Sequence, residues 1–101
     1  MDSQVRFDSG RLHLHGELTV YTCGDLKPQL LEQLEQHVDA TALELSQVTE
    51  IDTAGLQVLL SARRHASELG RDLEVANPSR AVTEVLALLG LDGRLAPKGE
   101  K

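Results

Sequence analysis

The sequence predicts a single α/β domain in which a mixed sheet of four or five strands carries three main helices. The chain has 101 residues, a length typical of one domain and too short for two. In some segments apolar residues alternate with polar ones, as in strands, and in others they recur every three to four residues, as in helices. Hydrophobic residues make up 41% of the chain and aromatic residues only 2%, so the expected core is aliphatic.

The first expected elements are two short strands joined by a tight turn. Apolar and polar residues alternate over residues 5–7 and again over residues 12–15. The turn-forming triplet Asp-Ser-Gly occupies residues 8–10, between the two strands. Gly16 is expected to end the second strand.

A first helix is expected to begin near residue 25. With Asp25 as the N-cap, Pro28 falls in the first turn, where a proline costs no intrahelical hydrogen bond. With Thr22 as the N-cap, Pro28 would remove one hydrogen bond and kink the helix, so the later start is preferred. The apolar stripe of this helix comprises Leu26, Leu30, Leu31, Leu34 and Val38.

Residues 42–45 form the third expected strand, and residues 46–51 are expected to connect it to a second helix. Asp52 is placed as the N-cap of that helix, because its carboxylate can accept hydrogen bonds from the first turn. The helix is expected to run to Leu69, and Gly70 suits a left-handed C-terminal cap. Its expected buried face comprises Leu56, Leu59, Leu60, Ala62, Ala66 and Leu69.

Residues 71–76 give a fourth strand, and Ser79 caps a last helix that Gly90 closes. Because a helix joins the third and fourth strands, that pair should be parallel, with a right-handed crossover. The last helix is expected to bury Val82, Val85, Leu86 and Leu89. The whole chain, residues 1–101, is interpreted as one domain with an ordered core from about residue 4 to 92 and a frayed tail over 93–101.

The net charge excludes two classes of partner. A formal charge of -6 is the wrong sign for binding nucleic acid, and an acidic membrane surface would repel the chain. The polar start MDSQVRFDSG and the single cysteine, Cys23, indicate a cytoplasmic location. The classes of partner that remain possible are another protein and a small-molecule ligand.

No complete enzyme motif is present, so neither a catalytic residue nor a cofactor is expected. His13 and His15 share one strand face, but no third ligand is placed nearby, so we interpret this face as solvent-exposed rather than as a metal site. Cys23 is interpreted as a small, partly buried residue rather than a nucleophile. Arg63-Arg64 and Arg71 could form a small basic spot, and we expect them to pair with local carboxylates.

The segment Asp52-Thr53-Ala54-Gly55 is the most distinctive in the chain. It opens a helix, where unpaired amides and the positive end of the helix dipole favour negative charge. A phosphate on Thr53 would gain these donors, while Asp52 and Glu50 would repel it. Gly55 is expected to leave the helix start bare enough for the backbone of a partner to approach.

Three motifs resemble those of the STAS domain family (sulfate transporter and anti-sigma factor antagonist). IDTAGL at residues 51–56 resembles the Asp-Ser-Ser-Gly-Leu and Asp-Thr-Gly-Gly-Leu motifs of that family. LHGEL at residues 14–18 resembles its Gly-Glu-Leu at the end of the second strand. The strand, Asn-Pro-Ser, helix and Leu-Gly-Leu over residues 75–91 resemble its closing unit, so the resemblance covers about residues 4–92.

The resemblance implies a regulatory protein-binding module of bacteria, similar to an anti-sigma factor antagonist. In those proteins the Ser or Thr after the Asp is phosphorylated by a serine kinase that is also the anti-sigma factor, and Thr53 matches that position. The unphosphorylated antagonist captures the kinase and so frees the sigma factor. The implied partner surface comprises Asp52, Thr53, Ala54 and Gly55 together with Gly16, Glu17, Leu18 and Thr19.

Two departures from the antagonist pattern keep other interpretations open. Ala54 replaces a second Ser, and Thr19 stands where antagonists commonly carry Asp after Gly-Glu-Leu. The sequence is therefore also compatible with a constitutive cytoplasmic subunit of a phospholipid ABC transporter, docked on a transporter ATPase, or with a component of a chemotaxis or signalling cluster. The simplest alternative is that Asp52 is only an N-cap and Thr53 only fills the first helical position.

Overall fold

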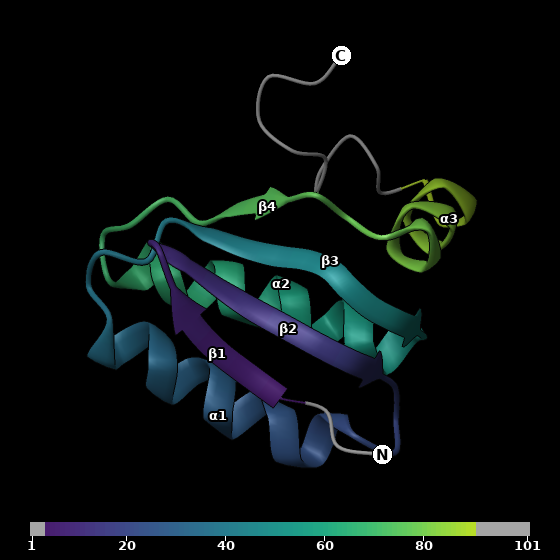
Figure 1. Ribbon diagram of the computed structural model, residues 1–101, viewed down its shortest axis with the longest axis horizontal. Helices are drawn as coiled ribbons and strands as arrows, with labels where there is room; N and C mark the ends of the chain where they lie inside the picture. Colours follow the sequence, from purple (N-terminus) through teal and green to yellow (C-terminus); the bar gives the residue numbers. More distant parts are fainter. Residues whose placement is uncertain (1–3, 91–101) are drawn as a thin grey trace.

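The computed structural model describes residues 4–90, which form four strands and three helices (Figure 1). In chain order these are β1 (Gln4–Asp8), β2 (Arg11–Leu18), α1 (Cys23–Gln36), β3 (Ala42–Ile51), α2 (Thr53–Glu68), β4 (Glu74–Ala76) and α3 (Arg80–Leu88). The predicted α/β class is confirmed, with four strands in the sheet. The tail predicted at 93–101 lies outside the described residues.

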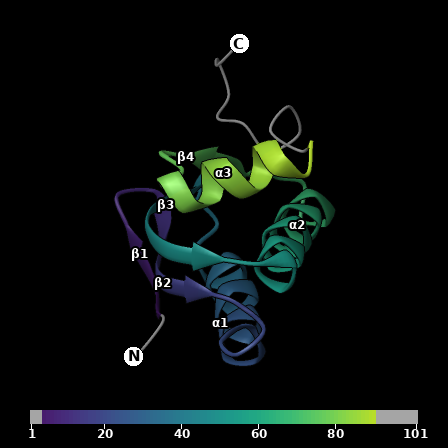
Figure 2. The ribbon, with the colours of Figure 1, turned by 90° about the vertical axis from the view of Figure 1, so that its right-hand side faces the viewer.

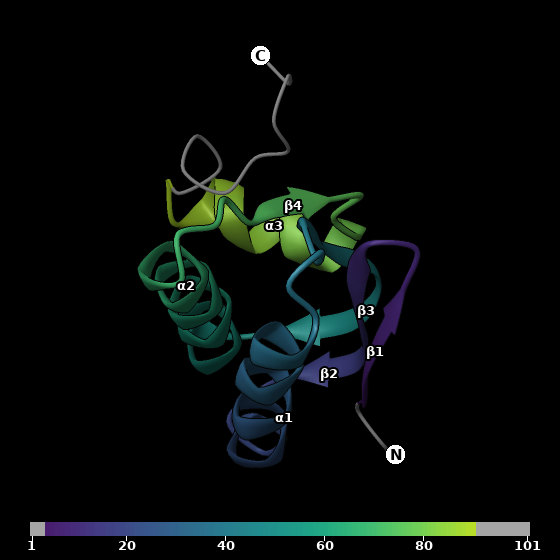
Figure 3. The ribbon, with the colours of Figure 1, turned by 90° about the vertical axis from the view of Figure 1, so that its left-hand side faces the viewer.

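The sheet is mixed and has the strand order β1-β2-β3-β4. β1 and β2 pair antiparallel as a hairpin, whereas β2 pairs parallel with β3 and β3 parallel with β4. The predicted parallel pair is thus present, and α1 makes a second crossover between the parallel strands β2 and β3. Both crossover helices, α1 and α2, cover the same face of the sheet (Figures 1 and 3).

The third helix, α3, lies beside β3 where the short strand β4 no longer pairs with it (Figure 2). The amide of Ser79, the N-cap of α3, donates to the carbonyl of Leu45 in β3 at 3.2 Å. The Ser79 hydroxyl accepts from the amide of Val82, as predicted for the cap. This placement shields the otherwise open edge of β3, which matters because exposed strand edges invite pairing with other chains.

The core is aliphatic, as predicted, and leucine dominates it. Side chains from β2, β3, α1 and α2 meet between the sheet and the two crossover helices, and the largest of them that are fully buried are Leu12, Leu14, Leu18, Leu26, Leu30, Leu34, Leu43, Leu45 and Leu59. From the last helix, Val82 and Leu86 join the core, while Val85 is partly buried.

Three positions predicted to be buried are exposed. Val38 is 77% exposed, Leu69 is 46% exposed and Leu89 is 47% exposed. The reason is common to all three: α1 ends at Gln36, α2 at Glu68 and α3 at Leu88, so each residue lies just past its helix. Once the chain leaves helical geometry, the apolar spacing no longer places the next side chain on the buried face.

The second and third strands are longer than predicted. Gly16 does not end β2 but adopts a φ of 96° at an irregularity in the pairing, after which the strand continues to Leu18. The predicted connector 46–51 is instead the second half of β3, in which Val48 pairs with Gly16 and Ile51 with Leu18. These shifts in register break the regular alternation, which is the signal that sequence reasoning uses to find strands.

The first helix begins earlier than predicted. Thr22 is the N-cap, and its carbonyl accepts hydrogen bonds from the amides of Asp25 and Leu26. Pro28 therefore lies inside α1, where its ring nitrogen has no hydrogen to donate to the carbonyl of Gly24. The early start is fixed by tertiary contacts of Thr22, whose hydroxyl donates to the Glu17 carbonyl at 2.8 Å and accepts from the Thr19 amide.

The fourth strand is shorter than predicted because Arg71, its expected first residue, has another role. The Arg71 guanidinium donates to the carbonyl oxygens of Leu34 and His37. These carbonyls belong to the last turn and the C-cap of α1, where a cation also interacts favourably with the helix dipole. Residues 71–73 thus connect α2 to α1 before β4 begins at Glu74.

Candidate functional site

The start of α2 is joined to the β2–α1 turn by the carboxylate of Asp52. One oxygen, Oδ1, accepts from the amide of Gly55 at 3.0 Å, which makes Asp52 the N-cap that the sequence predicts. The other oxygen, Oδ2, accepts from the amide of Val20 at 3.0 Å. In addition, the Asp52 amide donates to the carbonyl of Leu18 at 3.1 Å. Two hydrogen bonds, to Val20 and Leu18, therefore fix the two segments relative to each other, and the third caps α2 itself.

Gly55 makes this approach sterically feasible. A Cβ atom at position 55 would lie 2.1 Å from the carbonyl oxygen of Leu18 and 2.8 Å from its Cβ. The space beside Gly55 is therefore filled by the backbone of the chain itself, and the expectation that this glycine leaves room for the backbone of a partner is wrong. Its role is to let the first turn of α2 pack directly against the end of β2.

The turn between β2 and α1 presents two apolar side chains that sequence reasoning missed. Val20 is 65% exposed and Tyr21 is 90% exposed, and the Val20 amide is held by Asp52. The Tyr21 amide donates to the hydroxyl of the buried Thr19 at 3.3 Å. We define Val20, Tyr21, Asp52 and Thr53 as the helix-start surface.

Thr53 itself is exposed at the first helical position of α2. Its neighbours Asp52 and Ala54 are half-buried, and Glu50, at the end of β3, is exposed. Thr53 is thus exposed directly after Asp52, the residue whose carboxylate holds the Val20 amide of the exposed turn. The motif that predicts a site at Thr53 therefore lies on the surface of the protein.

The remaining residues of the predicted partner surface lie beneath this surface. Gly16, Leu18, Thr19 and Gly55 are buried, and Glu17 is half-buried. Four of them form the end of β2 and the turn that follows it, and Gly55 lies in the first turn of α2 against Leu18. Only the exposed and half-buried residues of the predicted partner surface can therefore contact a partner through their side chains. Val20 and Tyr21 add exposed apolar area that the predicted surface lacked.

The local field at the helix start is dominated by main-chain amides. Hydrogen bonds from the amides of Val20 and Gly55 hold the pKa of Asp52 below its ordinary value, so its carboxylate stays charged. Burial and the nearby charge of Asp52 raise the pKa of the Cys23 thiol, which is half-buried at the start of α1. A raised pKa makes Cys23 a poor nucleophile, consistent with its interpretation as a packing residue.

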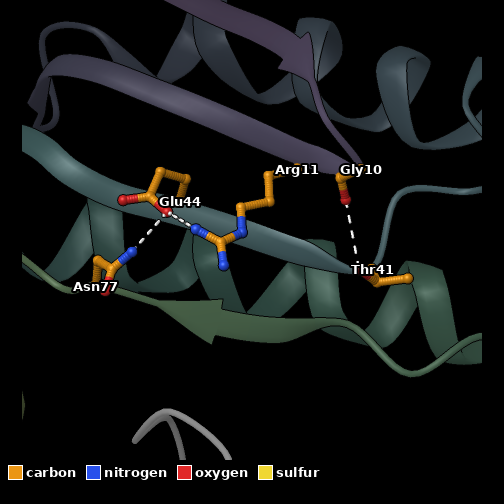
Figure 4. A network of polar contacts seen from close by, with 5 residues as sticks. All are labelled: Gly10, Arg11, Thr41, Glu44 and Asn77. Carbon is orange, nitrogen blue, oxygen red and sulfur yellow. Dashed lines mark hydrogen bonds and ion pairs between the residues drawn. The ribbon is translucent and has the colours of Figure 1, made fainter.

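A second polar cluster lies on the face of the sheet that α1 and α2 leave uncovered (Figure 4). Glu44 in β3 is only 5% exposed, and its Oε1 accepts from Arg11 at 2.7 Å and from Asn77 at 3.0 Å. Burial would raise the pKa of Glu44, but hydrogen bonds from Ser46, Asn77 and Arg11 together lower it. This cluster is satisfied internally and ties β2, β3 and the residue after β4 together.

Three other expectations concern sites for metals, membranes and charges. Both histidines of β2 lie on this uncovered face, where His13 is half-buried and His15 is exposed. Residues 4–90 contain no group of three side chains that could together hold a metal ion. Within the same range, no helix is long and apolar enough to cross a bilayer. The expectation that Arg71 pairs with a carboxylate is wrong, since its guanidinium donates to main-chain carbonyls. Arg63 Nε donates to the Leu73 carbonyl at 3.0 Å, which is one of its polar interactions.

Comparison with known proteins identifies the architecture. A family model described as "Mlab, STAS domain" matches residues 1–97, and no curated protein matches the chain. The crystal structure of a proposed anti-sigma factor antagonist from Thermotoga maritima is 23% identical over 90% of this chain and 80% of that one, with a TM-score of 0.71.

Two structures of the anti-sigma factor antagonist SpoIIAA are also similar. The unphosphorylated form is 15% identical, covers 86% of this chain and 83% of that one, and has a TM-score of 0.62. The phosphorylated form, described as a Bacillus cell fate determinant, is 17% identical, covers 93% and 87%, and has a TM-score of 0.63. At these identities the likeness shows a shared fold.

Proposed function

Because the chain belongs to the STAS domain family, we propose that it is a regulatory protein-binding module whose helix-start surface captures a protein partner, and that phosphorylation of Thr53 turns this binding off. The proposal resembles the role of an anti-sigma factor antagonist. It includes no catalytic residue, cofactor or metal, and it places the protein in the cytoplasm, where a kinase and ATP are available.

One observation carries the proposal: the exposed Thr53 hydroxyl lies at a helix start that is rigidly joined to an exposed apolar turn. Tyrosine is one of the side chains enriched among the residues that dominate binding at protein interfaces, and Tyr21 is 90% exposed. A partner that covers Val20 and Tyr21 would also cover Thr53, because the Asp52 carboxylate holds the two segments together. Modification of Thr53 would then act directly on the interface.

The expected effect of the phosphate follows from its charge. A phosphate adds about -1.5 to -2 charges at neutral pH. The folded domain tolerates it because Thr53 is exposed and the phosphate stays hydrated, although the Gly55 amide is already engaged by Asp52. An interface would have to bury the dianion beside Asp52 and Glu50, and burying an unpaired charge is costly. Binding should therefore be lost while the fold persists.

The chemistry of the switch favours a partner that is itself a serine or threonine kinase, such as an anti-sigma-like ATPase. Such an enzyme must accommodate the Thr53 hydroxyl in order to phosphorylate it, so its catalytic surface and the helix-start surface already meet. Product release then coincides with dissociation, because the new charge weakens the same contact. One interface thereby serves as substrate site and regulatory contact.

A second candidate function is favoured by Thr19. Antagonists commonly carry a carboxylate here, whereas the Thr19 side chain is buried and accepts a hydrogen bond from the Tyr21 amide. A surface without that carboxylate, and with Ala54 in place of a second hydroxyl, also suits constitutive docking. In this alternative the protein is a permanent subunit of a phospholipid ABC transporter or of a chemotaxis or signalling cluster, and Thr53 is an ordinary contact to a transporter ATPase.

Phosphate mapping tests the proposal. The purified protein is incubated with ATP and the serine kinase or ATPase encoded beside its gene, and modified peptides are identified by mass spectrometry. We expect phosphate on Thr53 of the parent protein and none on the Thr53→Ala variant, which should still bind the partner. A kinase that is active on another substrate but leaves Thr53 unmodified would refute the switch and favour the constitutive subunit.

A further inference from the structure

An open groove runs along the solvent-facing side of α2. Its volume is about 460 Å³, within the range of specific binding sites. On α2 it is lined by Gln57, Leu60, Arg63, Arg64 and Ser67, and residues 71–73 form its other side. Leu60 is half-buried and Leu73 buried, so these two contribute the apolar part of the lining. We refer to these residues as the arginine groove.

The arginine groove concentrates positive charge in an acidic chain. Arg63, Arg64 and Arg71 line it against one carboxylate, Asp72, whereas the chain as a whole has a formal charge of -6. Arg71 donates to carbonyls at the end of α1 and, within the part of the chain that the structure describes, forms no ion pair with a carboxylate. Arg64 is exposed and, among residues 4–90, forms no hydrogen bond or ion pair. The lining of the groove thus carries a net positive formal charge in a chain whose net charge is negative.

The same helix stripe connects the arginine groove to Thr53. Thr53, Gln57 and Arg64 are exposed and follow one another at separations of four and seven residues, which places them on one side of α2. At 1.5 Å per residue, Arg64 lies about 16 Å along the helix from Thr53. A typical partner footprint of about 800 Å² extends far enough to include both.

We infer that the arginine groove binds an acidic peptide segment of the protein partner that covers Thr53. The inference rests on the proposed function for the existence of that partner, and it adds the chemistry of a second contact. Carboxylate side chains complement the free Arg64 and the fixed Arg71, and an open groove accommodates an extended chain. Acidic residues placed here would also be steered towards the groove by its positive charge.

Binding of a model peptide tests the arginine groove without the partner. Hexaglutamate is titrated into the ¹⁵N-labelled protein at low salt, with hexalysine and inorganic phosphate as separate probes. We expect hexaglutamate to shift the amide resonances of Gln57, Arg64 and Ser67. Raising the salt concentration from about 0.05 M to about 0.5 M should abolish the shifts, because the contacts are exposed to screening.

Two charge reversals give the matched comparison. Arg64→Glu should weaken hexaglutamate binding about five- to tenfold, since it replaces an attraction with a repulsion. Arg80→Glu makes the same change on α3, where Arg80 pairs with Glu84 and is 91% exposed, and it should leave binding within about twofold of the parent.

Three outcomes would overturn the inference. Hexaglutamate could shift amide resonances outside the arginine groove, or Arg64→Glu and Arg80→Glu could weaken its binding equally. Inorganic phosphate could also bind the groove as strongly as hexaglutamate does. None of these outcomes bears on Thr53, because the peptide titration involves no partner and no phosphorylation. Conversely, loss of the Thr53 switch would leave hexaglutamate binding unchanged. The two proposals can therefore fail separately.

Discussion

Asp52 has two separate roles that its two carboxylate oxygens make compatible. One oxygen caps α2 through the Gly55 amide, and the other holds the Val20 amide of the exposed turn. An N-cap needs only the first of these bonds. The second bond gives the residue a role in the candidate interface, because it positions Val20 and Tyr21 beside Thr53 without Asp52 itself having to touch a partner.

Asp52→Asn should separate these roles through their dependence on pH. Asparagine can cap the helix but has one acceptor oxygen instead of two, so we expect a loss of about 1 kcal/mol at neutral pH. Because the folded-state pKa of Asp52 is lowered, its contribution is present above the ordinary carboxyl pKa and is lost as pH falls through the folded value. Urea unfolding should therefore show a gap between parent and variant at about pH 7 that shrinks at about pH 3.

The control for this experiment is Asp39→Asn, which removes the same charge from an exposed loop position. Its stability should stay within about 0.5 kcal/mol of the parent at both pH values. A gap for Asp52→Asn that stays constant or grows on acidification would contradict the assigned role of the charged carboxylate.

At the scale of elements, the contact between the first turn of α2 and the end of β2 sets the geometry of the site. Gly55 allows this contact, since a side chain there would meet the Leu18 backbone. The extended pairing of β2 with β3 carries Leu18 to this point, and Ile51 pairs with it directly before the helix begins. The length of β2 and β3 is therefore part of the site and not only of the scaffold.

Gly55→Ala should destabilise the protein although alanine is the better helix former. The gain in helix propensity is about 1 kcal/mol, but a Cβ atom 2.1 Å from a carbonyl oxygen forces the helix away from β2. We expect a net loss of about 1–3 kcal/mol in urea unfolding. Gly24→Ala in α1 is the matched control, because nothing lies within 4 Å of its Cβ position, and it should stabilise by about 0.5–1 kcal/mol. Equal effects of the two changes would show that the close approach is not real.

The sequence predicted the elements whose signals are local. Asp52 and Ser79 cap α2 and α3 as expected, and the hairpin turn falls at Ser9 and Gly10, both with positive φ. The predictions from sequence failed where a contact with a residue far away in the sequence decides where an element begins or ends. The start of α1 depends on the contact of Thr22 with Glu17, and the second half of β3 exists because β2 continues alongside it.

The candidate site divides in the same way. Asp52 and Thr53 were found through a short motif, because their spacing and order carry the signal. Val20 and Tyr21 were missed, since the bond that brings them to Thr53 joins residues that are 32 positions apart in sequence. An apolar pair in a turn has no sequence pattern that distinguishes an exposed anchor from a core residue.

At the scale of the whole molecule, the helix-start surface and the arginine groove meet along α2, in a chain whose formal net charge is -6. The helix-start surface lies at the N-terminal end of α2, and the arginine groove follows along the helix from Gln57 to Ser67. The leucine core beneath reaches the arginine groove through Leu73 and the half-buried Leu60, whereas Thr53, Gln57 and Arg64 are exposed and lie outside it. Changes on this surface should therefore alter binding with little effect on folding, which makes binding measurements with surface variants informative.

The most direct test of the account is calorimetric titration of the partner ATPase with the parent protein, Thr53→Ala and Thr53→Glu. Both variants should unfold within about 0.5 kcal/mol of the parent, because Thr53 is exposed. We expect Thr53→Ala to bind like the parent and Thr53→Glu to bind at least about tenfold more weakly, a difference of about 1.4 kcal/mol. Equal affinity of Thr53→Glu and the parent would contradict the claim that charge at this helix start controls partner binding.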